Sequence, residues 1–238
     1  ELLHNKTQNY SAGLSYGDVI NELMGSLNVS YWHRHSNLMY GTTYTGSLSR
    51  IESYDIPNSS NGYNTAMTLS KRFDTIATTV NLQGGFMQSW SQVLRQDVVV
   101  PTRFDNLTIG VGFNSLLFRA IRIIYDANYT RSKSFVENAT DFYPIDILRQ
   151  NASVNFIIKK RWICRFGTEH YYNTAISGAN SNMYFFDASL DYNTKRVEYS
   201  LEGRNLLNVR SFNSARTTEL VNYVYSYQLR PFSIMLKV

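Results

Sequence analysis

Seven charged residues in the last third of the chain have the types and spacing that acid–base chemistry would need. They are Arg165, Glu169, Asp187, Asp191, Glu198, Glu202 and Arg204. A pair of carboxylates on one face of a sheet can act as general acid and general base. The interpretation that we favour is a hydrogen-bonded polar wall, because the sequence offers no set of nucleophile, base and orienting group. We therefore predict no catalytic residue and do not expect an enzyme.

Five tyrosines form a second group of candidates, for ligand contact. They are Tyr171, Tyr172, Tyr223, Tyr225 and Tyr227. Tyrosine rings can stack on a sugar or an aromatic ligand. They are also common in the aromatic girdle at the rim of a membrane barrel, so either role is possible for these five residues. His33 and His35 would share one face of a strand, as a pair of metal ligands does, but no cysteine or carboxylate cluster accompanies them. No metal site and no cofactor are predicted.

Alternation of apolar and polar residues indicates the elements that carry these side chains. In residues 186–192 and 197–202 every second residue is apolar, and only residues 193–196 separate the two runs. Alternate side chains of a strand point to opposite faces, so this stretch predicts an antiparallel hairpin. The same alternation recurs along the chain, most regularly from Leu107 to Phe113. It predicts about eleven strands and no helix.

Composition narrows the class of protein. Charged residues make up 17% of the chain and aromatic residues 14%, whereas soluble domains are about a quarter charged. No run of about 18 apolar residues occurs, so no transmembrane helix is predicted. The net charge of +5 comes from short clusters of Lys and Arg at expected turns, which does not indicate a nucleic-acid partner. Cys164 is the single cysteine, which excludes an internal disulfide.

The connections between the expected strands alternate in length. Short joins are expected at residues 17–23, 72–75, 114–118, 159–161 and 193–196, and long ones at about 36–61, 91–103, 131–147, 174–182 and 208–221. Short turns at one rim and long loops at the other are typical of an outer-membrane barrel, whose sheet must close because lipid cannot hydrogen-bond its edges. We predict an all-β, transmembrane, antiparallel up-and-down β-barrel with the seven charged residues facing its lumen. The alternative is a soluble sandwich, which would need a second sheet over the apolar faces.

Four motifs near the C-terminus carry a family resemblance. Residues 169–173 (EHYYN), 186–190 (FDASL), 203–208 (GRNLLN) and 227–231 (YQLRP) occur in this order. Together they resemble the C-terminal end of TonB-dependent outer-membrane receptors, in particular the SusC-like and carboxypeptidase-like-plug branches. Residues 205–208 resemble the N-L-F-N element before the last extracellular loop of that family. The alternating run after Pro231 resembles its closing strand, and we expect the natural C-terminus about two to four residues beyond Val238.

The resemblance implies a membrane protein with several partners. Members of this family are 22-stranded barrels with an N-terminal plug, and the inner membrane energises them through the protein TonB. The implied location is the outer membrane of a Gram-negative bacterium. The implied partners are outer-membrane lipid, the plug and first barrel half, the TonB complex and a surface lipoprotein, with no nucleic acid. Residues 1–238 contain no plug and about half of the family's strands, so we expect them to be the C-terminal half of a longer barrel.

Two functions remain open at this point. The expected one is the barrel wall and extracellular loops of a TonB-dependent importer for a nutrient of the glycan, peptide or siderophore class. In such an importer the seven charged residues would form a lumenal wall against the plug. The alternative is a non-energised surface barrel that acts as a receptor, an adhesin or a structural porin. A plug-bearing region before Glu1 would distinguish the two, because only the importer needs one.

Overall fold

The computed structural model describes residues 4–45, 48–95, 98–137, 143–159, 161–217 and 222–237. The strands are β1 (Asn5–Asp18), β2 (Leu23–Ser36), β3 (Met39–Thr45), β4 (Leu48–Tyr54), β5 (Asn58–Phe73), β6 (Thr78–Arg95), β7 (Val98–Leu117), β8 (Ile121–Val136), β9 (Ile145–Ile158), β10 (Trp162–Asn173), β11 (Asn182–Asn193), β12 (Glu198–Arg204), β13 (Ser211–Thr217), β14 (Asn222–Gln228) and β15 (Ser233–Lys237). Two 3-10 turns, η1 (Asp74–Ile76) and η2 (Gly178–Ser181), complete the described elements. No helix in these ranges is long and apolar enough to cross a membrane.

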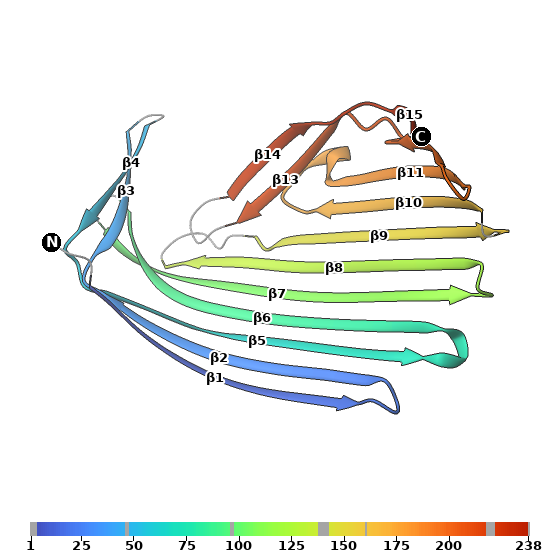
Figure 1. The fold of residues 1–238 in the computed structure, drawn as a ribbon. Helices are drawn as coiled ribbons and strands as arrows, with labels where there is room; N and C mark the ends of the chain where they lie inside the picture. Colours follow the sequence, from blue (N-terminus) through green and yellow to red (C-terminus); the bar gives the residue numbers. More distant parts are fainter. Residues whose placement is uncertain are drawn as a thin grey trace.

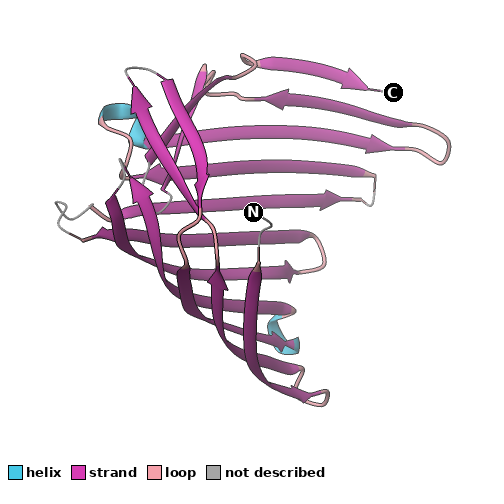
Figure 2. Cartoon of the chain, turned by 90° about the vertical axis from the view of Figure 1, so that its left-hand side faces the viewer, coloured by secondary structure: helices cyan, strands magenta, loops and turns pink. Residues whose placement is uncertain are grey.

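Eleven strands form one antiparallel up-and-down path, in the order β1-β2-β5-β6-β7-β8-β9-β10-β11-β12-β15. This confirms the predicted all-β class and the meandering connectivity. The sheet bends into a trough that is open between β1 and β15, as Figure 2 shows. The described residues therefore do not form a closed barrel. The β3–β4 hairpin pairs with the end of β6, and β13–β14 forms a separate two-stranded sheet (Figure 1).

Four of the five short connections lie close to the predicted ranges, but residues 114–117 belong to β7 and that turn lies at residues 118–120. Strands also occupy parts of four of the expected long loops, at 36–61, 91–103, 131–147 and 208–221. Residues 36–61 contain the β3–β4 hairpin and the start of β5, residues 91–95 belong to β6, and residues 98–103 belong to β7. Outside the apolar part of the sheet, neighbouring strands can continue to form backbone hydrogen bonds although neither strand has an apolar face there. The alternation that reveals a strand is therefore lost there, while the pairing Arg95↔Val98 to Trp90↔Arg103 continues.

One face of the sheet, which we call the apolar face, is almost uncovered. It carries Leu14, Leu27, Met67, Val111 and Leu190, which are 71%, 40%, 50%, 39% and 38% exposed. Soluble monomers rarely expose an apolar patch larger than a few hundred Å², and here it extends across the whole sheet. The described residues provide no second sheet against it, as a soluble sandwich would require.

Aromatic pairs border the apolar face on both sides. Those nearer the long connections are Tyr10–Tyr31, Tyr63–Trp90 and His170–Tyr184, with ring centroids 6.4, 5.8 and 4.4 Å apart. Those nearer the short turns are Phe113–Tyr125 and Trp162–Tyr192, at 5.4 and 4.4 Å. Two aromatic girdles around an apolar band are typical of the lipid-facing surface of membrane barrels.

The register of the sheet is staggered in one direction. A continuous row of paired residues runs from Tyr16 in β1 through Leu82 and Val111 to Tyr184 in β11. Tyr16 lies two residues before the end of β1, whereas Tyr184 lies nine residues before the end of β11. Strands must tilt and shear in this way when a sheet curls around an axis, so the stagger matches the bend seen in Figure 2.

Candidate functional site: the polar face and the hairpin that covers its end

The opposite face, which we call the polar face, is a ladder of short polar side chains joined across the strands. Ser26 Oγ lies 2.7 Å from Thr68 Oγ1, Ser70 Oγ donates to Asn81 Oδ1 at 2.8 Å, and Gln83 Nε2 donates to Asn128 Oδ1 at 2.6 Å. The Gln83–Asn128 bond passes over β7 at Gly110, where a Cβ would overlap the Gln83 side chain. Only glycine fits there, because the Gln83 side chain must pass over this position to reach Asn128.

Grooves follow this polar face, as expected for the inner side of a bent sheet. One of about 260 Å³ lies over Ser70, Gln83 and Asp126, and one of about 380 Å³ lies over Asn155, Arg165 and Glu202, with other residues of the same strands completing each lining. Most of the residues that line the two grooves have hydroxyl, amide or charged side chains, and apolar atoms of the same strands complete the surface. The polar face thus offers hydrogen-bond donors and acceptors to water, in contrast to the apolar face.

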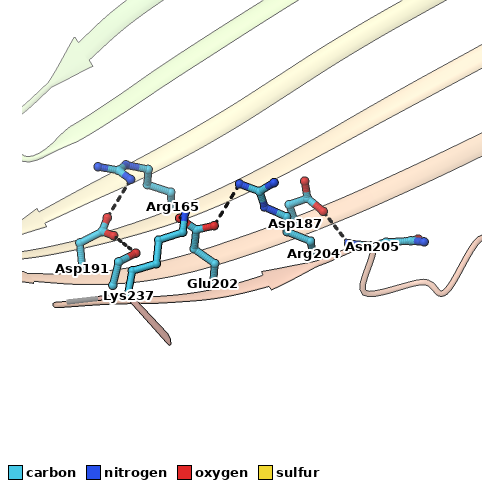
Figure 3. Close-up of polar contacts among 8 residues, drawn as sticks. Arg165, Asp187, Asp191, Glu202, Arg204, Asn205 and Lys237 are labelled. Carbon is cyan, nitrogen blue, oxygen red and sulfur yellow. Dashed lines mark hydrogen bonds and ion pairs between the residues drawn. The ribbon is translucent and has the colours of Figure 1, made fainter. Parts of the chain in front are cut away.

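All seven predicted wall residues lie on the polar face, because they share the strand phase opposite to Phe166, Leu190 and Leu201. Asp191 is the most buried, at 1% exposed. Its Oδ1 accepts a hydrogen bond of 2.6 Å from Ser200 Oγ, and its Oδ2 lies 2.8 Å from Arg165 Nη1 (Figure 3). Asp191 therefore joins β10, β11 and β12 at their turn ends.

Two of the remaining carboxylates have cationic partners. Glu202 accepts from Lys237 Nζ at 2.6 Å and from Arg204 Nη2 at 3.0 Å, which ties β12 to β15 (Figure 3). Glu169 lies 3.9 Å from Arg149 Nη2. Glu198 is exposed beside the β11–β12 turn. These contacts describe a structural wall in which most of the carboxylates are paired with cations. No group of three or more His, Cys, Asp or Glu residues in the described ranges is arranged to hold a metal ion.

Asn205 holds the point where the chain leaves the main sheet. It has a left-handed backbone (φ 52°), which asparagine tolerates better than most residues. Its backbone N–H donates to Asp187 Oδ1 at 2.7 Å, and its Nδ2 donates to the carbonyls of Val209 and Arg230, both at 2.8 Å. Its Oδ1 accepts from Val209 N–H at 2.9 Å. One side chain therefore fixes both legs of the segment that carries β13 and β14.

That segment folds over the polar face. The Phe212 ring in β13 lies 5.0 Å from Tyr171 and 6.3 Å from Phe185, both of which belong to the polar face. Asn173 is completely buried beside it, and Ala215 is 2% exposed. Asn173 Nδ2 donates to Tyr171 Oη at 3.0 Å and reaches the Ala215 carbonyl at 3.5 Å. The hairpin is thus docked on the loop end of the trough, where Figure 1 shows it crossing the sheet.

Three tyrosines form a row on the hairpin. The rings of Tyr223, Tyr225 and Tyr227 are nearly parallel, with centroids 6.2 and 6.3 Å apart, and they are 43%, 42% and 53% exposed. Tyr227 is paired directly with Phe212, so the row shares the face of the hairpin that meets the trough. A groove of about 360 Å³ lies beside Phe212, and its lining is completed by Glu169, Phe185, Asp187, Arg204, Asn205, Leu229 and Arg230. The arrangement offers stacking surfaces next to charged groups.

The structure separates the adjacent pair that the sequence grouped together. Tyr171 lies on the polar face under Phe212, whereas Tyr172 is paired with Leu148 and Asn182 on the apolar face. The reason is that neighbouring residues of a strand point to opposite sides. Phe212 and Asn173, which dock the hairpin, were not singled out from the sequence. Asn173 ends the EHYYN motif at residues 169–173 and Phe212 lies in an expected long loop, and neither pattern indicates that the two residues dock the hairpin.

Comparison with known proteins adds no assignment to this geometry. No protein-family model matches the chain, and no curated protein matches it.

Proposed function

We propose that this chain forms part of the wall, and part of the outer mouth, of a TonB-dependent outer-membrane importer. The single observation that carries the proposal is the division of one staggered sheet into two faces. A bare apolar band between aromatic girdles suits lipid, and a polar, grooved face with a hairpin docked on it suits a water-filled lumen. The four C-terminal motifs add the family resemblance.

The proposal includes further strands that complete the barrel. Because the path has eleven alternating strands, β1 and β15 run in the same direction. Direct closure between them would make a parallel seam in an otherwise antiparallel sheet. An odd number of additional strands restores antiparallel pairing at both edges, and eleven more would give the 22 strands of plugged outer-membrane transporters.

In this proposal the two groups of candidate residues have different roles. The wall residues from Arg165 to Arg204 hold the barrel and present hydrogen-bonding groups to a plug. The tyrosine row at 223–227 and the groove beneath Phe212 lie at the long-loop end, which is extracellular in such barrels. A ligand that stacks on the row would next meet Glu169 and Arg230 in the groove. The row thus serves as a first contact for the imported nutrient.

The test uses the complete protein in its native cells. Cys164 lies on the apolar face, paired with Phe156 and Leu190. We expect a lipid-soluble maleimide to label it in intact outer membranes and a sulfonated, water-soluble maleimide to leave it unlabelled. The matched position on the other face is Ser189→Cys in a Cys164→Ser background, because Ser189 precedes Leu190 on the neighbouring strand. Labelling of Cys164 by the water-soluble reagent alone would contradict a lipid-facing apolar surface.

A second experiment separates the importer from a non-energised barrel. The importer should be crosslinked to TonB in energised cells, and uptake of its nutrient should stop when TonB is removed. A protein that is lipid-embedded by the labelling test but never contacts TonB would instead be a surface receptor, adhesin or porin.

A further inference from the structure

We propose that the free edge of β14 binds an imported oligopeptide as an added strand, so that the protein recognises the main chain of the peptide. This rests on the proposed function, because it names the class of nutrient that the tyrosine row contacts. β14 pairs with β13 and with no other strand that the structure describes. An edge strand presents unpaired N–H and C=O groups, and an extended chain can bind to them.

The base of the hairpin shows which backbone groups point to the free edge. The Leu229 N–H donates to the Arg210 carbonyl at 2.9 Å, in the same register as the β13–β14 pairing. Along an antiparallel edge strand, every second residue directs its N–H and C=O groups to the partner strand. The backbone groups of the three tyrosines in the row therefore bond to β13, whereas Val224 and Ser226 direct theirs to the free edge.

This edge lacks the features that normally keep an edge strand from pairing, which are charges, prolines and bulges. Residues 222–228 (NYVYSYQ) contain no charged residue and no proline, and their pairing with β13 is continuous. The side chains of residues 223–228 are all exposed, that of Val224 to 63%. Tyrosine and valine favour strands, and exposed segments of this kind pair readily with a further strand. β14 is therefore suited to acquire one.

The β3–β4 hairpin provides a contrast within the same chain. β4 has the same length as β14 and, among the described strands, pairs only with β3. It carries Arg50 and Glu52, whose Nη2 and Oε1 atoms lie 2.7 Å apart, and its hairpin projects from the end of the sheet (Figure 1). Charges protect an edge that other folded proteins can reach. β14 lies over the trough instead, where the wall of the proposed barrel leaves access only to a single extended chain.

The surroundings of β14 favour a peptide over a sugar. The side chains of an added strand would alternate between the tyrosine row and the face that carries Val224. The groove beside Phe212 contains charged side chains of both signs, namely Glu169, Asp187, Arg204 and Arg230. The free backbone groups of Val224 and Ser226 recur after two residues, or about 7 Å. An extended peptide matches this repeat with its own N–H and C=O groups, whatever its sequence, whereas a sugar has no such main chain.

The binding test uses the complete protein, purified in detergent from its native membrane, and a fluorescein-labelled hexapeptide of alternating threonine and valine. Fluorescence anisotropy measures the Kd. Ser226→Pro removes an N–H from the free edge and none of the bonds to β13, so we expect it to weaken binding at least fivefold. Ser226→Ala is the matched control, because it keeps the N–H and should leave the Kd unchanged.

Two further measurements isolate the main-chain contact. The hexapeptide with every amide N-methylated has the same side chains but cannot pair, and it should not bind. Methylation of every second amide leaves one edge of the peptide intact, so this peptide should still bind. Residue-resolved hydrogen exchange should show the amides of Val224 and Ser226 exchanging quickly in the free protein and at least fivefold more slowly with saturating hexapeptide.

Each outcome decides one point. Equal affinity of the wild type and Ser226→Pro overturns the edge site, and if that variant does not fold, binding of the fully methylated peptide overturns it alone. Slow exchange at Val224 and Ser226 without peptide would show that another segment already covers the edge, which also overturns it. Displacement of the hexapeptide by maltohexaose overturns the peptide class. A protein that passes the maleimide and TonB tests but binds no hexapeptide contradicts this site and leaves the proposed function standing.

Discussion

Val111→Arg is the substitution that tests the two-faced sheet most directly. Val111 lies in the middle of the apolar band, between Ile109 and Phe113 along β7 and between Leu82 and Ala127 across the sheet. An arginine on the lipid face near the bilayer midplane costs about 2–4 kcal/mol, which is about a 30- to 700-fold change in the unfolding equilibrium. If the same face met water, the change would stay within about 0.5 kcal/mol.

Gly112→Arg is the matched control, because it adds the same side chain one residue further on the polar face. A Cβ at Gly112 would lie 2.8 Å from Asp126 Oδ1, and the next nearest atom is at 3.5 Å. The Asp126 carboxylate can rotate and then pair with the new guanidinium, so we expect a cost below about 1 kcal/mol. Gly110 is unsuitable for this purpose, since its neighbour Gln83 Cγ cannot move as freely.

The assay is urea unfolding of the complete protein in lipid vesicles, followed by tryptophan fluorescence and by the gel mobility of unheated samples. We expect the unfolding midpoint of Val111→Arg to fall well below that of Gly112→Arg. The reasoning is refuted if the two variants lose the same free energy, or if Val111→Arg is neutral.

Asn205→Ala removes the hydrogen-bond partners of the Val209 N–H and of two carbonyls. The docking of the β13–β14 hairpin should then weaken by about 1–3 kcal/mol, and a protease should cleave the hairpin. Protease resistance equal to that of the wild type would contradict the anchoring role of Asn205. Arg165→Ala leaves the buried Asp191 carboxylate without its cation. It should lower the free energy of unfolding more than the double variant Arg165→Ala with Asp191→Ala does. Additive losses of free energy in a double-mutant cycle would rule out the coupling between the two residues. At the β1–β2 turn, the Asn21 side chain holds the pKa of Asp18 below its usual value of 3.8. A lowered folded pKa gives stability that is present above the unfolded value and is lost as pH falls through the folded pKa. The protection of the Asn21 amide, measured against its intrinsic exchange rate at each pH, should therefore fall at acid pH in the wild type and stay constant in Asp18→Asn.

The sequence alone determined the apolar parts of the main-sheet strands and the face on which their side chains lie. A period of two is a local property, so the alternation of Leu107 to Phe113 is sufficient to predict both the strand and its apolar side. The short turns followed from the breaks in that alternation. Arg165, Asp187 and Glu202 could be assigned to one face because each lies an odd number of residues from an apolar residue of its own strand, namely Phe166, Leu190 and Leu201.

The sequence could not predict the parts of the fold that depend on residues far apart. The extension of β6 and β7 beyond the apolar band is fixed by backbone pairing, which leaves no trace in side-chain polarity. The pairing of β7 with β8 likewise brings Arg103 and Lys133 to the ring of Phe135. Neither residue is marked by a motif.

The docking of the hairpin on the polar face was decided by tertiary structure alone. Residues 208–221 read as a polar loop, and the direction in which such a loop folds depends on what it can bury. Here Phe212 meets Tyr171 and Phe185, and Asn205 closes the base with hydrogen bonds to Val209 and Arg230. Alternation along a strand predicts the face on which each side chain lies, but only contacts between residues far apart in the sequence determine what covers that face.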